Sequence, residues 1–187
     1  MMKRTFDILL SLFLLALFFI PMSIIALCVR FNSCGPSLFW SDRVGRNNSI
    51  FKMPKFRTMY IDSPNVATHL VKDPTKHLTS IGGLLRNSSM DELPQLISVF
   101  KGDLSFVGPR PALYNQEDLI QLRKMMGIDR LKPGITGWAQ VNGRDELSIE
   151  EKVHLDAEYM NDRSFAFDCK ILWMTGIRVF LGRGIAH

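Results

Sequence analysis

An uncharged segment near the N-terminus constrains this chain more than any other feature. From Ile8 to Val29 there are 22 residues without a charge, rich in Leu, Ile and Phe. A straight helix of that length reaches about 33 Å, which is enough to cross a hydrocarbon core of about 30 Å. Core helices of soluble proteins seldom have this composition. The segment is therefore predicted to attach the chain to a membrane.

Three interpretations of this segment are open: a spanning helix, a cleaved signal peptide and a re-entrant helix. Lys3 and Arg4 precede the apolar run, as in a signal peptide. No small-x-small cleavage site follows the run, however, and Arg30 closes it directly, which argues against cleavage. Spanning is the simplest interpretation.

Two features favour a re-entrant helix that enters the membrane and returns. Pro21 removes a backbone donor within the run and kinks the helix there, and Ser23 can satisfy a freed carbonyl. Basic residues lie on both sides of the run, namely Lys3, Arg4, Arg30, Arg43 and Arg46. The positive-inside rule then places both ends on the cytoplasmic side. We predict a break at Pro21 and re-entry, with spanning still open.

The remainder of the chain is expected to form one domain. The chain has 187 residues, of which 47% are hydrophobic and 22% charged. This suits one globular domain of roughly 100–150 residues with an appended segment. No repeat, low-complexity tract or Gly/Ser linker divides it. We assign residues 1–30 to the membrane segment and residues 31–187 to a catalytic domain that faces the cytosol.

Charge and cysteine usage narrow the partners and the compartment. The formal net charge of +5 favours anionic partners, whether phosphorylated metabolites, anionic lipid head groups or nucleic acid. The cysteines Cys28, Cys34 and Cys169 have neither CxxC nor zinc-site spacing. A reducing compartment therefore fits best.

The expected secondary structure is mostly helical with few strands, an α+β fold. The stretch from Ser37 to Met59 predicts a β-hairpin around Gly45–Asn48, with Pro54 in an edge strand. The polar stretch from Ile61 to Thr79 predicts an irregular loop. Helices are expected at residues 81–86, 92–100, 116–126, 149–160 and 167–181. The last has cationic residues between apolar ones, which fits an interfacial helix or a core helix.

The segment from Ser88 to Leu96 is the most informative for chemistry. Pro94 is tolerated only in the first turn of a helix, so Asp91 is expected at or beside the N-cap. Asp91 would then simply cap that helix, or Ser89 and Glu92 would form a capping box. A helix N-terminus also keeps a carboxylate ionised, and an ionised carboxylate can act as a nucleophile.

Four arginines lie beside conformational restraints and suggest a phosphate site. Pro109 and Pro111 flank Arg110, so the backbone there is held and the guanidinium loses little entropy on binding phosphate. The others are Arg57, Arg86 and Arg144. One such arginine is by default a surface charge, whereas four around rigid turns favour a di-anionic ligand.

Four motifs resemble the signatures of the bacterial sugar transferase family, the monotopic phosphoglycosyl transferases. They are KFRTM at 55–59, DELPQL at 91–96, KGDLSFVGPRP at 101–111 and KPGITGWAQVNGR at 132–144. Their order and spacing match, and the resemblance covers nearly the whole chain, as in the minimal members. One departure is Ile20 before Pro21, where family members often carry Ser-Pro.

The resemblance implies transfer of a phosphosugar from a UDP-sugar to a polyprenyl phosphate, usually undecaprenyl phosphate, with release of UMP. This step opens glycoconjugate or polysaccharide biosynthesis, and downstream glycosyltransferases would be partners. The implied location is the bacterial inner membrane, with the catalytic domain on the cytoplasmic face. The implied fold has a re-entrant membrane helix, interfacial amphipathic helices and a small β-hairpin. No motif fixes which UDP-sugar is used.

The resemblance also implies roles for particular residues. Family members form a covalent phosphosugar intermediate on the Asp of an Asp-Glu dyad with Mg²⁺, which corresponds here to Asp91 and Glu92. Asp91 would also bind the metal, and Glu92 would either position Mg²⁺ or manage the proton of the acceptor. Phosphate or nucleotide contacts would come from Arg57, Arg86, Arg110 and Arg144. Asp168 matches an acidic family position at the metal or nucleotide site.

A different class of function competes with this one. A membrane-anchored scaffold that only binds anionic lipid or partner proteins through its basic residues would need no Asp-Glu dyad. Nucleic-acid binding is not expected, because the basic residues lie in rigid turns and no RRM, KH or helix-turn-helix signature is present.

Overall fold

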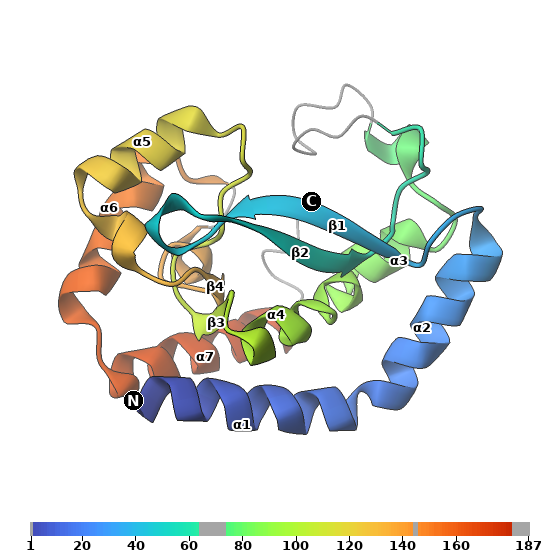
Figure 1. Cartoon of the computed structure of the whole chain (residues 1–187), viewed down its shortest axis with the longest axis horizontal. Coiled ribbons are helices and arrows are strands. Elements are labelled where there is room, and N and C mark those ends of the chain that lie inside the picture. Colours follow the sequence, from blue (N-terminus) through green and yellow to red (C-terminus); the bar gives the residue numbers. More distant parts are fainter. Residues whose placement is uncertain (1, 64–73, 144–145, 181–187) are drawn as a thin grey trace.

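The computed structural model describes residues 2–63, 74–143 and 146–180 (Figure 1). The helices are α1 Met2–Leu17, α2 Phe19–Asn32, α3 Gly82–Asn87, α4 Gln95–Lys101, α5 Glu117–Met125, α6 Ile149–Asp162 and α7 Phe165–Phe180. The strands are β1 Leu38–Val44, β2 Ile50–Phe56, β3 Ser105–Val107 and β4 Gly134–Thr136. The predicted class, mostly helical with a small hairpin, is confirmed.

The hairpin follows from its turn. Strands β1 and β2 pair antiparallel, with Leu38 opposite Phe56. Asn47 and Asn48 between them have φ angles of 55° and 58°, a left-handed conformation that Asn adopts more readily than most residues. Pro54 lies opposite Trp40 in this two-stranded sheet, where each strand is an edge. The predicted hairpin is therefore confirmed.

A second, parallel pair of short strands was not expected from the sequence. Strand β3 pairs with β4, with Ser105 opposite Gly134 and Val107 opposite Thr136. Each strand has only three residues, too few for an alternating pattern to stand out. The pair lies in the main core beside α4, α6 and α7 (Figure 1).

The three C-terminal helices agree with the sequence to within two residues at each end. Helix α7 is both a core helix and an exposed one. Ile171 is fully buried in the main core, whereas Trp173 is 72% exposed on the same helix. The core interpretation is confirmed for the buried side of the helix, and the interfacial interpretation of the exposed side stays a prediction.

The break in the N-terminal segment lies at Phe18, three residues before the predicted position. Helices α1 and α2 are bent by 61° there. Pro21 has no N–H to give the carbonyl of Leu17, and its ring would clash with that carbonyl, so a proline breaks a helix about one turn upstream. Pro21 itself lies in the first turn of α2, where its missing donor costs little. The predicted break at Pro21 is thus corrected to Phe18.

Ser23 does not satisfy the carbonyl that Pro21 frees. Its hydroxyl donates to the carbonyl of Phe19 at 2.8 Å, one turn upstream on α2. Among the described residues, no single helix is long and apolar enough to cross a bilayer, and only α1 and α2 taken together as a bent pair meet those criteria.

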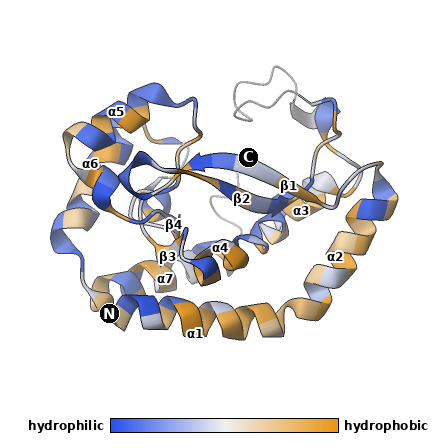
Figure 2. Cartoon of the chain, viewed as in Figure 1, coloured by the Kyte–Doolittle hydropathy of each residue, from blue (hydrophilic) through white to orange (hydrophobic). Residues whose placement is uncertain are grey.

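Helix α1 buries two polar side chains, Asp7 and Ser11, and exposes several apolar ones. Asp7 and Ser11 are 3% and 0% exposed, and the Asp7 carboxylate accepts a hydrogen bond from the backbone N–H of Phe106 in β3. The exposed face of the bent pair consists of Leu9, Leu12, Phe13, Leu17, Phe19, Ile20, Ile24 and Leu27. Apolar residues accordingly line α1 and α2 in Figure 2, whereas polar residues are frequent on α5 and α6. An inverted pattern of this kind is expected where lipid replaces water.

The first residues of α1 are fastened to the domain that follows α2. The Lys3 amine donates to the carbonyl of Val107 at 2.8 Å and pairs with the Asp168 carboxylate at 2.8 Å. Arg4 donates to the carbonyls of Val99 and Phe100, each at 2.7 Å. The start of the apolar segment therefore lies against the same body as the chain after its end.

Candidate active site

Asp91 lies in a tight turn between α3 and α4. Ser89 before it has a φ of 56°, a left-handed conformation that costs a non-glycine residue free energy and is often found at functional sites. A single 3₁₀ turn, Met90–Glu92, follows, and α4 begins only after Pro94. Neither the turn nor α4 has a side-chain cap, so the predicted capping by Asp91 and the capping box of Ser89 and Glu92 are both wrong.

The Asp91 carboxyl group is buried and only partly satisfied. The residue is 4% exposed, and its Oδ1 atom has no hydrogen-bond partner among the described residues. Burial raises the pKa of Asp91 to about 6, and the nearby Glu92 adds to this, while Lys55 and Arg86 act against it. A buried polar atom without a partner is costly, so this atom is suited to accept a cation or to react.

Glu92 is held by cations from two other segments. The Lys55 amine on β2 lies 2.7 Å from its Oε1 atom, and the Arg110 guanidinium lies 3.9 Å from the same atom. Arg86 on α3 donates through Nε to the Thr58 hydroxyl at 2.9 Å and acts electrostatically on Asp91. The dyad thus lies among cations from β2, α3 and the loop after β3.

Arg43 on β1 adds a further cation to this group. Burial lowers its pKa to about 10, and the neighbouring Arg110 lowers it further, while Glu92 opposes the change. The guanidinium donates to the Ser41 hydroxyl and the Pro111 carbonyl. Both guanidinium groups are partly exposed, and the charge of Arg110 acts on Arg43. Like charges repel each other, and an anionic ligand such as a diphosphate would relieve that repulsion.

Comparison with known proteins gives this site a family. The model described as bacterial sugar transferase matches residues 1–182. The chain belongs to the bacterial sugar transferase family. It is accordingly a transferase, and the resemblance drawn from the four motifs is confirmed.

Relatives in this family include short and long proteins. The chain is 41% identical over 184 residues to the uncharacterized sugar transferase EpsL of Bacillus subtilis, covering 98% of this chain and 90% of that one. It is 38% identical over 191 residues to the UDP-glucose:undecaprenyl-phosphate glucose-1-phosphate transferase of Escherichia coli, covering 98% and 41%. It is 33% identical over 204 residues to the undecaprenyl-phosphate galactose phosphotransferase of Salmonella typhimurium, covering 100% and 42%. The chain thus spans about two fifths of the latter two transferases.

The structure brings some of the predicted site residues of this sugar transferase together. Asp91, Glu92, Arg86 and Arg110 form one group. Arg57 lies apart from them, because its guanidinium donates to the carbonyls of Ser33 and Cys34 after α2. Arg57 therefore ties the end of the membrane segment to the hairpin, and its phosphate contact stays a prediction.

Two other predicted residues lie elsewhere. Asp168 is 4% exposed, pairs with Lys3 and accepts a hydrogen bond from the Tyr159 hydroxyl at 2.7 Å. These partners belong to α1 and α6, whereas the cations around the dyad come from β1, β2, α3 and the loop after β3. Its role at a metal or nucleotide stays a prediction. Arg144 lies outside the described residues.

Sequence reasoning missed Lys55 and Arg43 as members of the site. From the sequence, Arg43 was used only to predict the membrane topology, and Lys55 was noted only within the KFRTM motif that contains Arg57. The strand pairing places Arg43 opposite Phe51, four residues before Lys55, so both cations lie on one face of the hairpin. The alternation within each strand could have placed the two cations on one face of the predicted hairpin, although not beside the dyad.

The donor chemistry at Asp91 fits Mg²⁺. Its unpartnered Oδ1 is a hard oxygen ligand inside a buried site. The described residues contain no group of three or more His, Cys, Asp or Glu side chains that could hold a metal. Protein-bound Mg²⁺ commonly takes only one or two carboxylates together with substrate phosphates, so one carboxylate at the site is compatible with it.

Proposed function

We propose that this chain transfers a phosphosugar from a UDP-sugar to undecaprenyl phosphate or a similar polyprenyl phosphate. The products would be the polyprenyl-diphosphate-sugar and UMP. The observation that carries the proposal is the buried Asp91 carboxyl, with one oxygen unpartnered, among Lys55, Arg86 and Arg110. The activities for which the Escherichia coli and Salmonella relatives are named support the acceptor and the class of reaction.

In the first step, an oxygen of ionised Asp91 attacks the β-phosphorus of the UDP-sugar. A bond forms between this oxygen and phosphorus, and the bond from phosphorus to the bridging oxygen breaks. UMP leaves with that bond's electron pair, and the phosphosugar remains on Asp91 as an acyl phosphate. Arg86 and Arg110 are placed to stabilise the negative charge on the phosphates and the departing UMP.

In the second step, an oxygen of the polyprenyl phosphate attacks the same phosphorus. The bond to Asp91 breaks, and the carboxylate is regenerated. Glu92 has two roles open to it: it can take a proton from the acceptor phosphate or position the metal. Its pair with Lys55 at 2.7 Å holds the carboxylate beside Asp91, which suits either role.

Asp91 would hold Mg²⁺ through its unpartnered oxygen, and the metal would supply charge neutralisation for the diphosphate. Burial at this site excludes water, so the acyl phosphate is protected from hydrolysis. Lys55 and Arg43 hold positive charge beside the dyad, which lowers the cost of bringing a second phosphate close to the first.

The membrane segment is proposed to be re-entrant and to keep this chemistry at the cytoplasmic head-group plane of the bacterial inner membrane. Lys3 and Arg4 contact the catalytic domain directly, and this domain also follows α2. A helix that crossed the bilayer would place these two ends on opposite sides. Entry and return through α1 and α2 leaves both ends, and Asp91, on one side.

The test is UMP release by the full chain in detergent with undecaprenyl phosphate, Mg²⁺ and a panel of UDP-sugars. At least one UDP-sugar should give turnover. Asp91→Asn should lower the rate by about 10³-fold or more, since it removes the nucleophile. Intact-mass measurement without acceptor should detect the phosphosugar adduct on the parent chain only.

Asp42→Asn is the matched control, because Asp42 is an exposed carboxylate on β1 that pairs with Lys52 across the hairpin, away from Asp91. Its rate should stay close to that of the parent. Full activity in Asp91→Asn would refute the nucleophile. The absence of UMP release from every UDP-sugar, with salt-sensitive vesicle binding unchanged by Asp91→Asn, would instead favour the scaffold.

A further inference from the structure

A second basic site lies away from the catalytic dyad. A cleft of about 900 Å³ opens where the start of α1, strand β3 and the start of α7 meet. Its walls contain six cationic residues, which are Lys3, Arg4, Arg46, Arg130, Lys132 and Arg163. The carboxylates in the same walls are Asp7 and Asp168. Neither Asp91 nor Glu92 lines it, so this cleft is not the active site.

The acidic residues of the cleft are already engaged, whereas several of its cations are not. Asp168 pairs with Lys3, and Asp7 accepts from the Phe106 backbone. Among the described residues, the side chains of Arg130, Lys132 and Arg163 have no ion pair or hydrogen bond. Positive charge is therefore in excess inside the cleft.

The surroundings of Lys132 confirm that these cations crowd one another. Burial is the largest cause that lowers its pKa, and Arg4 and Arg46 also lower it, while Asp7 and Asp103 raise it. Like charges that are held together raise the free energy of the folded chain, and a bound anion lowers it again.

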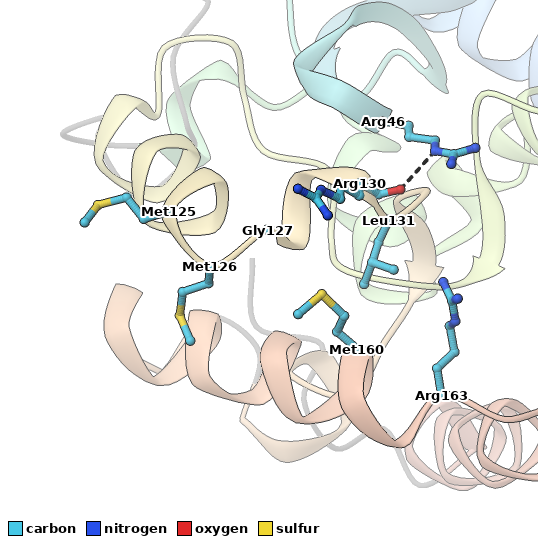
Figure 3. A pocket seen from close by; sticks show the side chains of 8 residues that line it. All are labelled: Arg46, Met125, Met126, Gly127, Arg130, Leu131, Met160 and Arg163. Atoms are coloured by element: carbon cyan, nitrogen blue, oxygen red, sulfur yellow. Dashed lines mark hydrogen bonds between the residues drawn. The ribbon is translucent and has the colours of Figure 1, made fainter.

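An adjoining cavity of about 510 Å³ gives the site an apolar side. It shares Arg46, Arg130, Leu131 and Arg163 with the cleft. Figure 3 shows Arg130 and Arg163 on either side of Leu131, with Met160 below Arg130 and Met126 farther to the left. Its remaining wall includes Met125, which is 82% exposed. The ligand space is thus cationic in its middle and apolar at its margin.

The position of the cleft relates it to the membrane segment. Lys3 and Arg4, in its wall, come directly before the exposed apolar face of α1. Met2 and Phe165 also line it and are 73% and 42% exposed, and Phe165 contacts Phe6 edge-on at 5.3 Å. Cations that border an apolar face lie at the depth of lipid phosphates when such a face enters a bilayer.

We propose that this cleft binds the phosphodiester of an anionic phospholipid head group. Arg130, Lys132 and Arg163 contact the phosphate, and the acyl chains extend over the exposed apolar face of α1. The proposal rests on the membrane attachment in the proposed function but not on the transfer reaction. Bound lipid would fix the height and tilt of the domain at the membrane surface.

The test measures binding of a short-chain phosphatidylglycerol to the full chain in neutral detergent. Dihexanoyl-phosphatidylglycerol should bind saturably, and dihexanoyl-phosphatidylcholine should bind much more weakly. Arg130→Gln combined with Arg163→Gln should weaken phosphatidylglycerol binding about tenfold, since each removes a charge-assisted contact. Lys52→Gln is the control, because Lys52 is an exposed cation on β2 outside the cleft, and its affinity should change less than twofold.

Three results would overturn the proposal. Inorganic phosphate or glycerol phosphate that binds as tightly as phosphatidylglycerol would show a site for soluble anions. Equally tight binding of phosphatidylcholine would show that the cations of the cleft do not determine which lipid binds. An equal loss in Lys52→Gln would show that net charge, rather than the cleft, attracts the lipid.

Two further variants keep this test independent of folding and of catalysis. If the double variant unfolds, Arg163→Gln alone should still weaken binding about threefold, because this residue follows the end of α6 and is exposed. Asp91→Asn should keep full phosphatidylglycerol binding while it loses UMP release. Lipid binding without any UMP release would refute the proposed function but not the lipid site. Turnover without lipid binding would refute the lipid site but not the proposed function.

Discussion

Asp91 combines burial with cationic neighbours, and this combination sets how it responds to pH. Burial raises the pKa of its carboxyl to about 6, although Lys55 and Arg86 lower it. The carboxyl is therefore protonated below about pH 6 and ionised above it. A protonated carboxyl is a poor nucleophile, so the activity should fall as the pH drops through this value.

We expect kcat/KM for UMP release to be level above pH 7 and to decline about tenfold per pH unit well below 6. The measurement is the initial rate at substrate concentrations below KM between pH 5 and 8, at constant ionic strength. Raising the Mg²⁺ concentration should shift the decline to lower pH, because a bound cation favours the ionised form. A profile that stays level down to pH 5 would contradict the assigned nucleophile.

Lys55 offers a second residue-level test. Its positive charge lowers the pKa of Asp91 and pairs with Glu92. In Lys55→Gln the pKa of Asp91 should rise further, so the acidic decline of kcat/KM should move to higher pH and the rate at pH 7 should fall. Lys52→Gln on the same strand removes an equal charge at an exposed position and should leave the profile in place.

The sequence predicted single site residues unevenly. Asp91 and Glu92 were predicted to lie in the turn before α4 because Pro94 limits where a helix can begin, and Arg110 was singled out because two prolines flank it. Their roles at the site stay predictions. The strand cations Lys55 and Arg43 were missed, since their proximity to the dyad depends on how the hairpin packs against the turn at Met90–Glu92. Tertiary packing of this kind has no signal within either segment.

At the scale of elements, long patterned segments were predicted well and local geometry less well. The hairpin and helices α5 to α7 follow their turn residues and periodicity closely. The break between α1 and α2 lies at Phe18 and not at the predicted Pro21, because a proline disrupts the helical turn that precedes it. Strands β3 and β4 were missed because three residues show no period.

The N-terminal elements also give a topology test. The contacts of Lys3 with Asp168 and Val107 hold the start of α1 against the catalytic domain. Cysteines introduced at Met2 and at Asn47 should therefore both resist a membrane-impermeant thiol reagent applied to intact cells. The background must lack Cys28, Cys34 and Cys169, which are all exposed. Permeabilised cells should label at both sites.

A labelled Met2 site together with a shielded Asn47 site would mean that the segment spans the membrane. It would also mean that the Lys3 contacts do not form in the membrane. Labelling at both sites in intact cells would place the catalytic domain outside and contradict the proposed cytoplasmic face.

At the scale of the whole molecule, the function that we propose involves three regions: the α1–α2 pair, the Asp91 dyad and α7. The apolar faces of α1 and α2 enter the lipid, and the Asp91 dyad carries out the transfer. Helix α7 begins beside α1, through the Phe6–Phe165 contact and the Lys3–Asp168 pair, and exposes Trp173 farther along. If α1 lies in the membrane, the exposed side of α7 lies close to it.

The three tryptophans make this orientation measurable. Trp173 is 72% exposed on α7, whereas Trp138 is partly buried and donates to Glu158 at 2.8 Å. Trp40 lies on the hairpin.

In single-tryptophan chains reconstituted into bilayers with brominated phosphatidylcholine, Trp173 fluorescence should be strongly quenched and Trp138 fluorescence only weakly, because bromine quenches at short range within the acyl region. Aqueous iodide should quench Trp173 fluorescence less than Trp138 fluorescence, although Trp173 is exposed in the protein alone. Quenching of Trp138 or Trp40 above that of Trp173 would show that another face of the molecule meets the lipid, and the head-group cleft beside Lys3 would then face water.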